Sequence, residues 1–467
     1  MAVADESAAR LAELPGWAQE FVASLMAEVA ALKAELAAAM KNSRNSSKPP
    51  STEHPHAKPA PKPKKSDRKQ GAQPGHDKHQ RELIPSEQCS IVHDHKPKTC
   101  GDCGQSLRGA VADLEPLRKQ VWEVPEIKPQ VTEHRLHRLT CVCCGGATRA
   151  ELPPDVPSLE AGPRLVALTA ILMAEFRCSK RKVAAFLQDV LSIPCSPGWV
   201  IKLQNRATEA MRPAYNELAK KLPTEKRLNI DESPTKQKSL KAWLWVFVAS
   251  KYTLFSLRPT RKATALFELL GPEFAGVVSS DRAKMYHHFG LLQWCWAHLI
   301  RDFQSWKDGQ DGAAKRLARD LEEPVTRLFE LWSRVRDGTL SRADFKIQVQ
   351  PIRKTIDSLL LRGVYRIAGP AQATCKELTD HRDRLWAFVD HEGVEPTNNA
   401  AERALRQAVI WRKLSFGTQS EKGSRFVETM LTILESCRQQ GRSAYKFAME
   451  SVSANYGTTP APTLTGA

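Results

Sequence analysis

The sequence lacks any apolar run that could cross a membrane. Its longest one, from Ala242 to Ala249, has only the length of a strand, whereas a membrane-spanning helix needs about 18 apolar residues. The N-terminus also lacks the pattern of a signal peptide, because Asp5 and Glu6 precede the first apolar stretch and Glu28 interrupts it. We therefore expect no membrane partner and a cytoplasmic location.

Acidic residues are fewer than basic ones, with 52 Asp and Glu against 69 Lys and Arg and a formal net charge of +17. An excess of this size favours polyanionic partners, namely DNA, RNA or an acidic membrane surface, and says nothing about the fold. The 42% hydrophobic content provides for a sizeable core, and 467 residues suffice for two or three domains.

Aromatic residues are absent from residues 41–82, which hold 7 prolines and 11 Lys or Arg against 4 Asp or Glu. A segment of this composition cannot bury a core. We predict a basic, Pro-rich linker over residues 44–85 that either follows DNA phosphates or is only solvated. Its candidate DNA-binding residues are Lys48, Lys64, Lys65, Arg68 and Lys69.

Disulfide bonds are not expected, because the chain lacks an export signal and its 11 cysteines are odd in number and clustered. Cys100-x2-Cys103 and Cys141-x2-Cys144 each place two sulfurs on one tight turn, as in tetrahedral zinc sites. We predict one structural Zn²⁺ in a zinc-binding module over residues 86–152, with no coordination position open for chemistry. The alternative is a set of reduced, buried cysteines.

Two regions have helical patterns before the first long strand. In residues 15–43 apolar side chains recur at alternating spacings of three and four, which predicts a coiled-coil helix; a helix docked on its own domain is the alternative. Residues 160–222 predict helices with a short turn before Ser196 and basic side chains nearby. This helix-turn-helix-like region is compatible with DNA binding, and plain helical packing explains it equally well.

Residues 226–306 change to a pattern of strands. We predict a three-strand antiparallel meander with Asp231 at the end of its first strand, then a short helix, a strand ending near Asp281, a fifth strand and a further helix. This order is that of a ribonuclease-H-like core in a multidomain α+β protein. Residues 307–392 predict a helical insertion, residues 393–455 a core helix and a C-terminal helix, and residues 456–467 a disordered tail.

Three carboxylates lie on separate elements of this core. Asp231 and Asp281 lie beside predicted strands, and Glu402 lies at a predicted helix start. Acidic groups of this kind in a basic protein suggest a site for two Mg²⁺ (or Mn²⁺) ions that cleaves nucleic acid, because paired divalent ions activate the nucleophile and neutralise the phosphate. The alternative is that each is a surface charge or a helix cap.

The motifs together resemble those of transposases of the bacterial insertion-sequence family 66, and they cover nearly the whole chain in the expected order. The matching stretches are Asn45-Ser46-Ser47-Lys48-Pro49-Pro50-Ser51, Gln73-Pro74-Gly75-His76, the two Cys-x2-Cys pairs, Asp231-Glu232-Ser233, Asp281 with Tyr286, Cys295-Trp296-Ala297-His298, Asn398-Asn399-Ala400-Ala401-Glu402-Arg403, Arg412-Lys413 and Gly417.

The resemblance implies a DDE-type catalytic domain with Asp231, Asp281 and Glu402 as the catalytic and metal-binding residues. Such enzymes bind the terminal inverted repeats of double-stranded element DNA, cleave one strand at each end and join it to target DNA. The resemblance also implies a homodimer or higher oligomer, accessory proteins of the same element, and a bacterial enzyme that joins the nucleoid when bound to DNA. Further candidate DNA contacts are Arg403, Arg406, Arg412 and Lys413.

Three residues and two other functions remain open at this point. Arg282 either marks a subgroup of the family or competes with metal for Asp281. His298 and Glu232 could each act as a proton shuttle or a metal ligand. The alternative is that His298 is a helix cap and Glu232 a strand-end charge. A catalytically impaired zinc-containing DNA-binding regulator derived from a transposase is the alternative function. A structure-selective nuclease of the same fold is a third hypothesis.

Overall fold

The computed structural model describes residues 15–39, 41, 45, 81–112, 115–154, 156–157, 159–457 and 459–465. The chain divides into two compact units, one of residues 54–128 and one of the remaining residues. No described helix is both long enough and apolar enough to span a membrane. Most of the predicted linker over residues 44–85, including Lys48, Lys64, Lys65, Arg68 and Lys69, lies outside the described residues.

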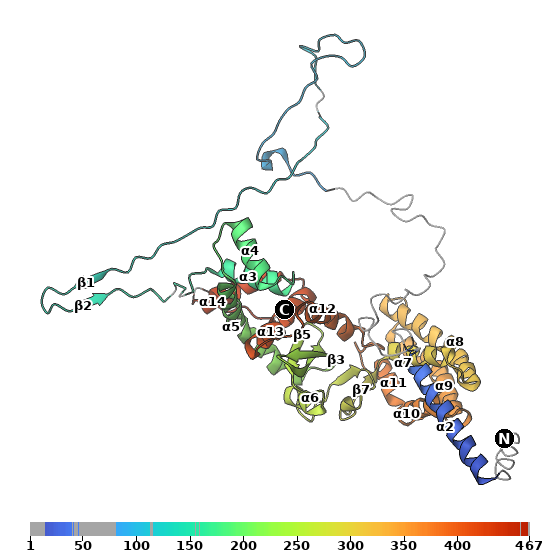
Figure 1. Ribbon diagram of the computed structural model, residues 1–467. Coiled ribbons are helices and arrows are strands. Elements are labelled where there is room, and N and C mark those ends of the chain that lie inside the picture. The colour runs from blue at the N-terminus through green and yellow to red at the C-terminus, as the bar shows by residue number, and fades with distance from the viewer. Residues whose placement is uncertain are drawn as a thin grey trace. The chain divides into compact units, whose positions relative to one another are not determined.

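A five-stranded mixed sheet forms the centre of the larger unit (Figure 1). Its strands are β3 (Arg227–Gln237), β4 (Leu240–Val248), β5 (Thr253–Arg258), β6 (Val277–Ser280) and β7 (Leu292–Trp294). The spatial order is β5-β4-β3-β6-β7. Strands β3, β4 and β5 pair antiparallel as two hairpins, whereas β6 and β7 pair parallel, β6 on β3 and β7 on β6.

Alternation along β4 separates the two faces of the sheet. Leu244, Val246 and Val248 pack with the apolar side of α12 (Asn399–Ser415). Trp245 and Phe247 point to the opposite face and join the largest core cluster. The sheet is therefore buried on both sides, which agrees with the nearly continuous apolar sequence of β4.

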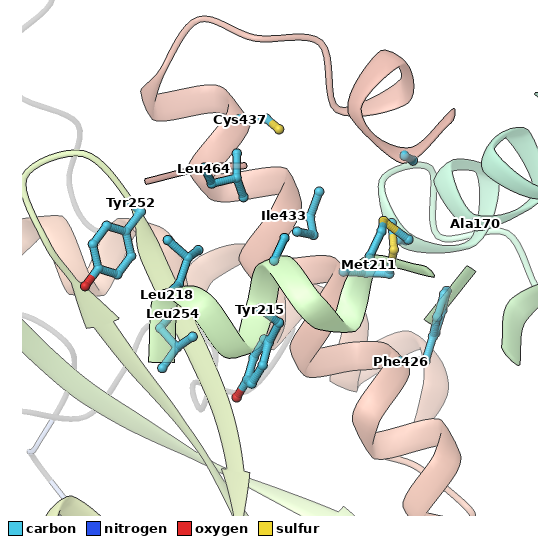
Figure 2. Close-up of a cluster of buried hydrophobic side chains, with 14 of the residues drawn as sticks. Ala170, Met211, Tyr215, Leu218, Tyr252, Leu254, Phe426, Ile433, Cys437 and Leu464 are labelled. Carbon is cyan, nitrogen blue, oxygen red and sulfur yellow. The ribbon is translucent and has the colours of Figure 1, made fainter. Parts of the chain in front are cut away.

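Helices from before, within and after the sheet region of the chain build that largest core. They are α3 (Pro163–Ala174), α4 (Lys180–Leu191), α5 (Pro197–Lys221), α6 (Ala263–Leu270), α13 (Glu421–Gln439) and α14 (Ala444–Asn455). Figure 2 shows Met211 and Tyr215 of α5 among buried side chains that include Ile433 of α13. Helix α5 buries side chains along most of its length against its neighbours, which agrees with plain helical packing; DNA binding by this region stays a prediction.

Helix α13 also covers the edge of the sheet at β5. Its Glu428, Thr432 and Ser436 recur every four residues and accept hydrogen bonds from the backbone N–H groups of alternate residues Leu257, Phe255 and Thr253, at 3.0, 2.9 and 3.1 Å. An edge strand otherwise presents such groups unpaired. One face of α13 thus provides the acceptors that a sixth strand would have provided.

The helices between β7 and α12 have a second core of their own. They are α7 (Trp296–Asp308), α8 (Gly312–Arg336), α9 (Arg342–Arg366), α10 (Gly369–Asp380) and α11 (Asp383–Asp390). Gly363 lies inside α9 instead of ending a helix, because α10 passes so close that an added Cβ would lie 2.5 Å from the Cys375 sulfur.

The C-terminal segment contradicts the prediction of a disordered tail over residues 456–467. Leu464 is 1% exposed and belongs to the cluster drawn in Figure 2, together with Cys437. Gln440 and Arg442 donate hydrogen bonds to the carbonyls of Leu464 and Thr463, at 2.8 and 2.7 Å. This segment has few apolar residues, but a single buried leucine and backbone hydrogen bonds suffice to hold a short segment against the core.

Candidate active site

Strand β3 carries a row of polar side chains on the face that α12 covers. Asp231 lies opposite Val246 of β4, whose side chain packs against α12, and residues directly opposite share a face. Asn229 and Ser233, two residues to either side, reach Asn398 and Arg412, at 3.0 Å in each case. The row therefore directs Asp231 toward the helix that carries Glu402.

The prediction that Asp231 ends its strand is wrong. Strand β3 continues to Gln237, and Pro234 pairs with Trp243. Between Asn229 and Lys236 the strand pairs with β4 alone, because β6 pairs only with Arg227, Leu228 and Asn229 and the bridge to Thr418 involves Gln237 at the end of the strand. A proline is compatible with a strand whose N–H side faces no second neighbour, so this proline is a poor stop signal.

Asp281 directly follows β6 and is fixed by its own backbone. Its Oδ1 accepts a hydrogen bond from Ala283 N–H at 2.9 Å. The adjacent Arg282 turns elsewhere and forms ion pairs with Asp302 of α7 and Glu377 of α10. Arg282 is thus engaged by two other carboxylates and holds the loop after β6 to the helical insertion.

Glu402 lies in the first turn of α12, and Asn398 before the helix determines where that turn starts. The buried Asn398 side chain donates to the Ile230 carbonyl at 2.7 Å and accepts from Asn229 at 3.0 Å. Its backbone N–H donates to the Cys295 sulfur at 3.1 Å. The start of α12 is therefore attached to β3 and to the residue before α7.

The three predicted carboxylates interact electrostatically. Desolvation raises the pKa of Asp231 well above its usual value, and the charges of Glu232, Asp281 and Glu402 raise it further. Close like charges disfavour ionisation of one another, so Asp231, Asp281 and Glu402 lie within electrostatic reach. A bound divalent cation would offset this repulsion, and hard carboxylate oxygens are what Mg²⁺ prefers.

Glu402 is nevertheless turned toward α7. Its Oε1 lies 3.7 Å from His298 Nδ1 and its Oε2 lies 3.6 Å from an Arg301 nitrogen. Desolvation lowers the pKa of His298, against the attraction of Glu402. Within the described residues, the one group of three potential ligands whose atoms all lie within 4.8 Å of one another is Cys295, His298 and Glu402.

Glu232 points to the other face of β3 and is not a strand-end charge, although its charge still raises the pKa of Asp231. Its side chain is 2% exposed, accepts a hydrogen bond from the Tyr286 hydroxyl at 2.6 Å and pairs with Arg261. Desolvation, with a contribution from Asp281, raises the pKa of Glu232. This buried network connects β3 to the turn after Asp281.

The basic residues predicted on α12 differ in their surroundings. Arg403, Arg406 and Lys413 are exposed. Arg412 instead donates hydrogen bonds to the Ser233 hydroxyl at 3.0 Å and to the Pro234 carbonyl. These bonds hold α12 on β3, and a contact of Arg412 with DNA stays a prediction.

The two Cys-x2-Cys pairs form similar turns. In the first, Cys100 N–H donates to the Gln105 carbonyl and Gly104 N–H to the Cys100 carbonyl; in the second, Cys141 and Gly145 repeat this pattern between β1 (Arg138–Thr140) and β2 (Ala147–Arg149). In each turn, hydrogen bonds from backbone N–H groups lower the pKa of the first cysteine. The largest effect comes from Cys103 on Cys100 and from Cys144 on Cys141. The unit boundary after Lys128 divides the predicted module over residues 86–152.

Sequence reasoning missed the parts of Asn398 and Cys295 in positioning Glu402. An asparagine directly before a helical pattern is a common N-cap signal, and Asn398 does precede α12. Its side chain binds β3 rather than its own helix. Cys295 belongs to a stretch that matches the family, but its bond to Asn398 had no local signal because the two residues lie 103 positions apart in the chain.

Comparison with known families matches three parts of the chain. A family model described as Transposase IS66 family matches residues 159–425, more than half of the chain. Another, described as zinc-finger binding domain of transposase IS66, matches residues 97–145, which include both Cys-x2-Cys pairs and support structural zinc. A third, described as Family of unknown function (DUF6444), matches residues 2–82.

Two curated relatives from Sinorhizobium fredii (strain NBRC 101917 / NGR234) are similar to parts of this chain. Uncharacterized protein y4qI is 26% identical over 234 residues, which is 45% of this chain and 43% of y4qI. Uncharacterized protein y4hP is 23% identical over 384 residues, which is 73% of this chain and 68% of y4hP. The first match therefore spans less than half the length of that relative.

Proposed function

Because the chain belongs to the IS66 transposase family, we propose that it is a DNA transposase that cleaves strands at the inverted repeats of an insertion sequence and joins them to target DNA. The observation that carries the proposal is the electrostatic contact among Asp231, Asp281 and Glu402, which come from β3, the end of β6 and the start of α12. A carboxylate whose pKa is raised by burial and by specific neighbouring charges, as for Asp231, is typical of functional sites.

The topology of the sheet supports a ribonuclease-H-like core. Three antiparallel strands followed by two parallel ones, in the order β5-β4-β3-β6-β7, correspond to the strand order expected for that fold. Asp231 lies on the central strand and Asp281 follows the strand next to it. The helices of residues 307–392 then form an insertion before the helix of Glu402.

Asp231, Asp281 and Glu402 are the residues that would hold two Mg²⁺ or Mn²⁺ ions. Such ions, when bound, stabilise the charge that develops during displacement at phosphorus. The protein contributes a fixed frame: Asn398 positions the first turn of α12, and Arg412 holds its last turn against β3. Asp281 keeps its orientation through the N–H of Ala283.

The remaining parts of the chain fit roles in DNA binding and assembly. The exposed Arg403 and Arg406 lie on the helix that carries Glu402, where they can contact phosphates close to the reaction. Helix α2 (Gly16–Ala39) exposes Phe21, Leu25 and Leu32 at 64%, 51% and 57%, which supports self-association through a coiled coil. Four zinc-bound cysteines would hold the zinc finger folded.

The decisive experiment is a strand-joining assay with Asp231→Asn in Mg²⁺ and a duplex that carries the element ends. We expect this variant to bind the end DNA as the wild type does and to lose cleavage and joining. Asp189→Asn, an exposed acidic residue on α4, is the matched control and should retain both activities. Undiminished joining by Asp231→Asn would contradict the assignment of the site.

The alternative function is a catalytically impaired DNA-binding regulator. One reason to favour it was that the Arg282 cation could compete with metal for Asp281. Arg282 instead pairs with Asp302 and Glu377, so its charge is already neutralised away from Asp281.

A further inference from the structure

A compact group of three potential metal ligands lies beside the proposed catalytic residues. Cys295 directly precedes α7, His298 lies in the first turn of that helix, and Glu402 lies in the first turn of α12. One ligand atom from each lies within 4.8 Å of the other two. The three residues combine a thiol, an imidazole and a carboxylate, which is a different donor set from the three carboxylates.

Two polar atoms of these residues are buried without hydrogen-bond partners. They are Nδ1 of His298 and Oε1 of Glu402, which lie 3.7 Å apart. The sulfur of Cys295 is on a residue that is 1% exposed and accepts a hydrogen bond from Asn398 N–H. Buried polar atoms are normally paired, so these two atoms are available to a ligand that pairs with both.

The frame around the group is firmly built. His298 N–H donates to the Cys295 carbonyl at 3.0 Å, and Cys295 N–H donates to the Ser280 carbonyl at 2.9 Å. Trp296 N–H donates to the Pro396 carbonyl at 3.0 Å. The start of α7 is thereby attached both to the end of β6 and to the segment before α12, so the ligands are held by backbone contacts rather than by exposed loops.

We propose that Cys295, His298 and Glu402 bind a thiophilic divalent cation of the Zn²⁺ type, and that this ion inhibits the enzyme by holding Glu402 away from Asp231 and Asp281. The inhibitory part rests on the proposed function, in which Glu402 is a catalytic ligand. Metal occupancy at this site would then regulate strand cleavage.

The chemistry of the ligands selects the ion. Thiolate and imidazole ligands favour Zn²⁺, whereas Mg²⁺ prefers oxygen ligands. Zn²⁺ with three protein ligands and one water is a common arrangement, and ligand distances of about 2.0–2.3 Å require only a small contraction of the present group. Arg301 lies near Oε2 of Glu402, so Oε1 remains the oxygen available to the ion.

The test is zinc content and zinc inhibition in the full-length protein. After equilibration with Zn²⁺ and removal of free metal, elemental analysis should find one Zn²⁺ fewer per chain in Cys295→Ser than in wild type. Serine keeps an acceptor for Asn398 N–H but removes the soft ligand. Cys375→Ser, which alters a buried cysteine in the insertion core, is the matched control and should keep the wild-type zinc content.

Inhibition is measured as the Zn²⁺ concentration that halves Mg²⁺-dependent nicking, relative to the zinc-free rate of each protein. We expect Cys295→Ser and His298→Asn to need at least about tenfold more Zn²⁺ than wild type and Cys375→Ser, because even the loss of a residue that only supports a metal ligand commonly weakens metal binding by about 10- to 100-fold. Equal zinc content in wild type and Cys295→Ser would overturn the site. Equal half-inhibitory concentrations would overturn the regulatory role.

The two proposals fail in different ways. If wild type does not nick DNA even in Mg²⁺ without zinc, the transposase activity is refuted, while the zinc count still decides whether the site exists. If nicking is normal and the zinc count does not change, only the inhibitory site is refuted.

Discussion

At the scale of single residues, Asn398 determines how α12 meets the sheet. Its side chain satisfies the carbonyl of Ile230 and the amide of Asn229, and its backbone binds the sulfur of Cys295. Asn398 therefore connects β3, the start of α12 and the residue before α7. A residue of this kind affects both stability and geometry.

We expect Asn398→Ala to lower the free energy of unfolding by about 1–3 kcal/mol, because the substitution leaves buried polar groups without partners. It should also lower the rate of nicking by moving the first turn of α12. Urea denaturation and a nicking assay measure the two effects. Asn399→Ala changes the exposed neighbouring asparagine and should leave stability unchanged within about 0.5 kcal/mol; equal losses in both variants would contradict the role of Asn398.

Asp231 should make the protein less stable at neutral pH. Its pKa is raised in the folded chain by desolvation and by neighbouring carboxylates, so its contribution to stability is present below the unfolded pKa and is lost as pH rises through the folded pKa. We expect Asp231→Asn, without divalent metal, to be about 0.5–3 kcal/mol more stable than wild type at pH 7. The difference should shrink as pH falls toward about 4.

Urea denaturation at a series of pH values measures this difference. Added Mg²⁺ should stabilise wild type more than Asp231→Asn, because a ligand that binds only the native site shifts unfolding by mass action. A variant that is less stable than wild type at pH 7 would contradict the repulsion inferred at this site.

Candidate residues were easier to predict than their contacts. Asp231, Asp281 and Glu402 were chosen from their positions beside elements, and the structure brings them into electrostatic reach. The turn of Glu402 toward His298 and the engagement of Arg282 by Asp302 and Glu377 depend on partners far away in the chain. No local pattern encodes such pairs.

At the scale of elements, the close contact between α9 and α10 requires a glycine. An added Cβ at Gly363 would lie 2.5 Å from the Cys375 sulfur and 2.8 Å from a Leu317 methyl group. Gly363 and Pro351 both lie within α9, although glycine and proline disfavour a helix interior. Glycine is a breaker on average, and here the packing of neighbouring helices overrides that average.

We expect Gly363→Ala to reduce stability by about 1–3 kcal/mol through overpacking, although alanine favours an isolated helix by about 1 kcal/mol. Gly312→Ala at the start of α8 is the control, because the added Cβ would meet only an Arg316 nitrogen at 3.6 Å. Thermal denaturation of both variants measures the contrast. A Gly363→Ala protein as stable as Gly312→Ala would show that α9 and α10 can separate without cost.

At the scale of the whole molecule, the C-terminal segment packs against the main core rather than extending away from it. Leu464 enters the main core, and the Thr463 hydroxyl donates to Glu217 of α5 at 2.9 Å. Composition alone predicted disorder, since a Thr- and Pro-rich sequence shows little apolar periodicity. One leucine that packs in the same core as residues of α13 is enough to order this segment.

Leu464→Ala should therefore destabilise the protein by about 2–5 kcal/mol, as for other buried leucines. Chemical denaturation followed by tryptophan fluorescence measures the loss. Thr459→Ala, an exposed substitution in the same segment, should have an effect below about 0.5 kcal/mol. If both variants unfold like wild type, the segment contributes nothing to the core.

The covering of β5 by α13 has a consequence for the order of synthesis. The acceptor for Leu257 N–H, Glu428, lies 171 positions later in the chain. A ribosome therefore completes β5 long before it makes the helix that covers this edge. During that interval the strand can pair with other nascent chains. We expect truncated products that end before residue 421 to aggregate. The edge of β5 is protected from such pairing only after α13 has been made.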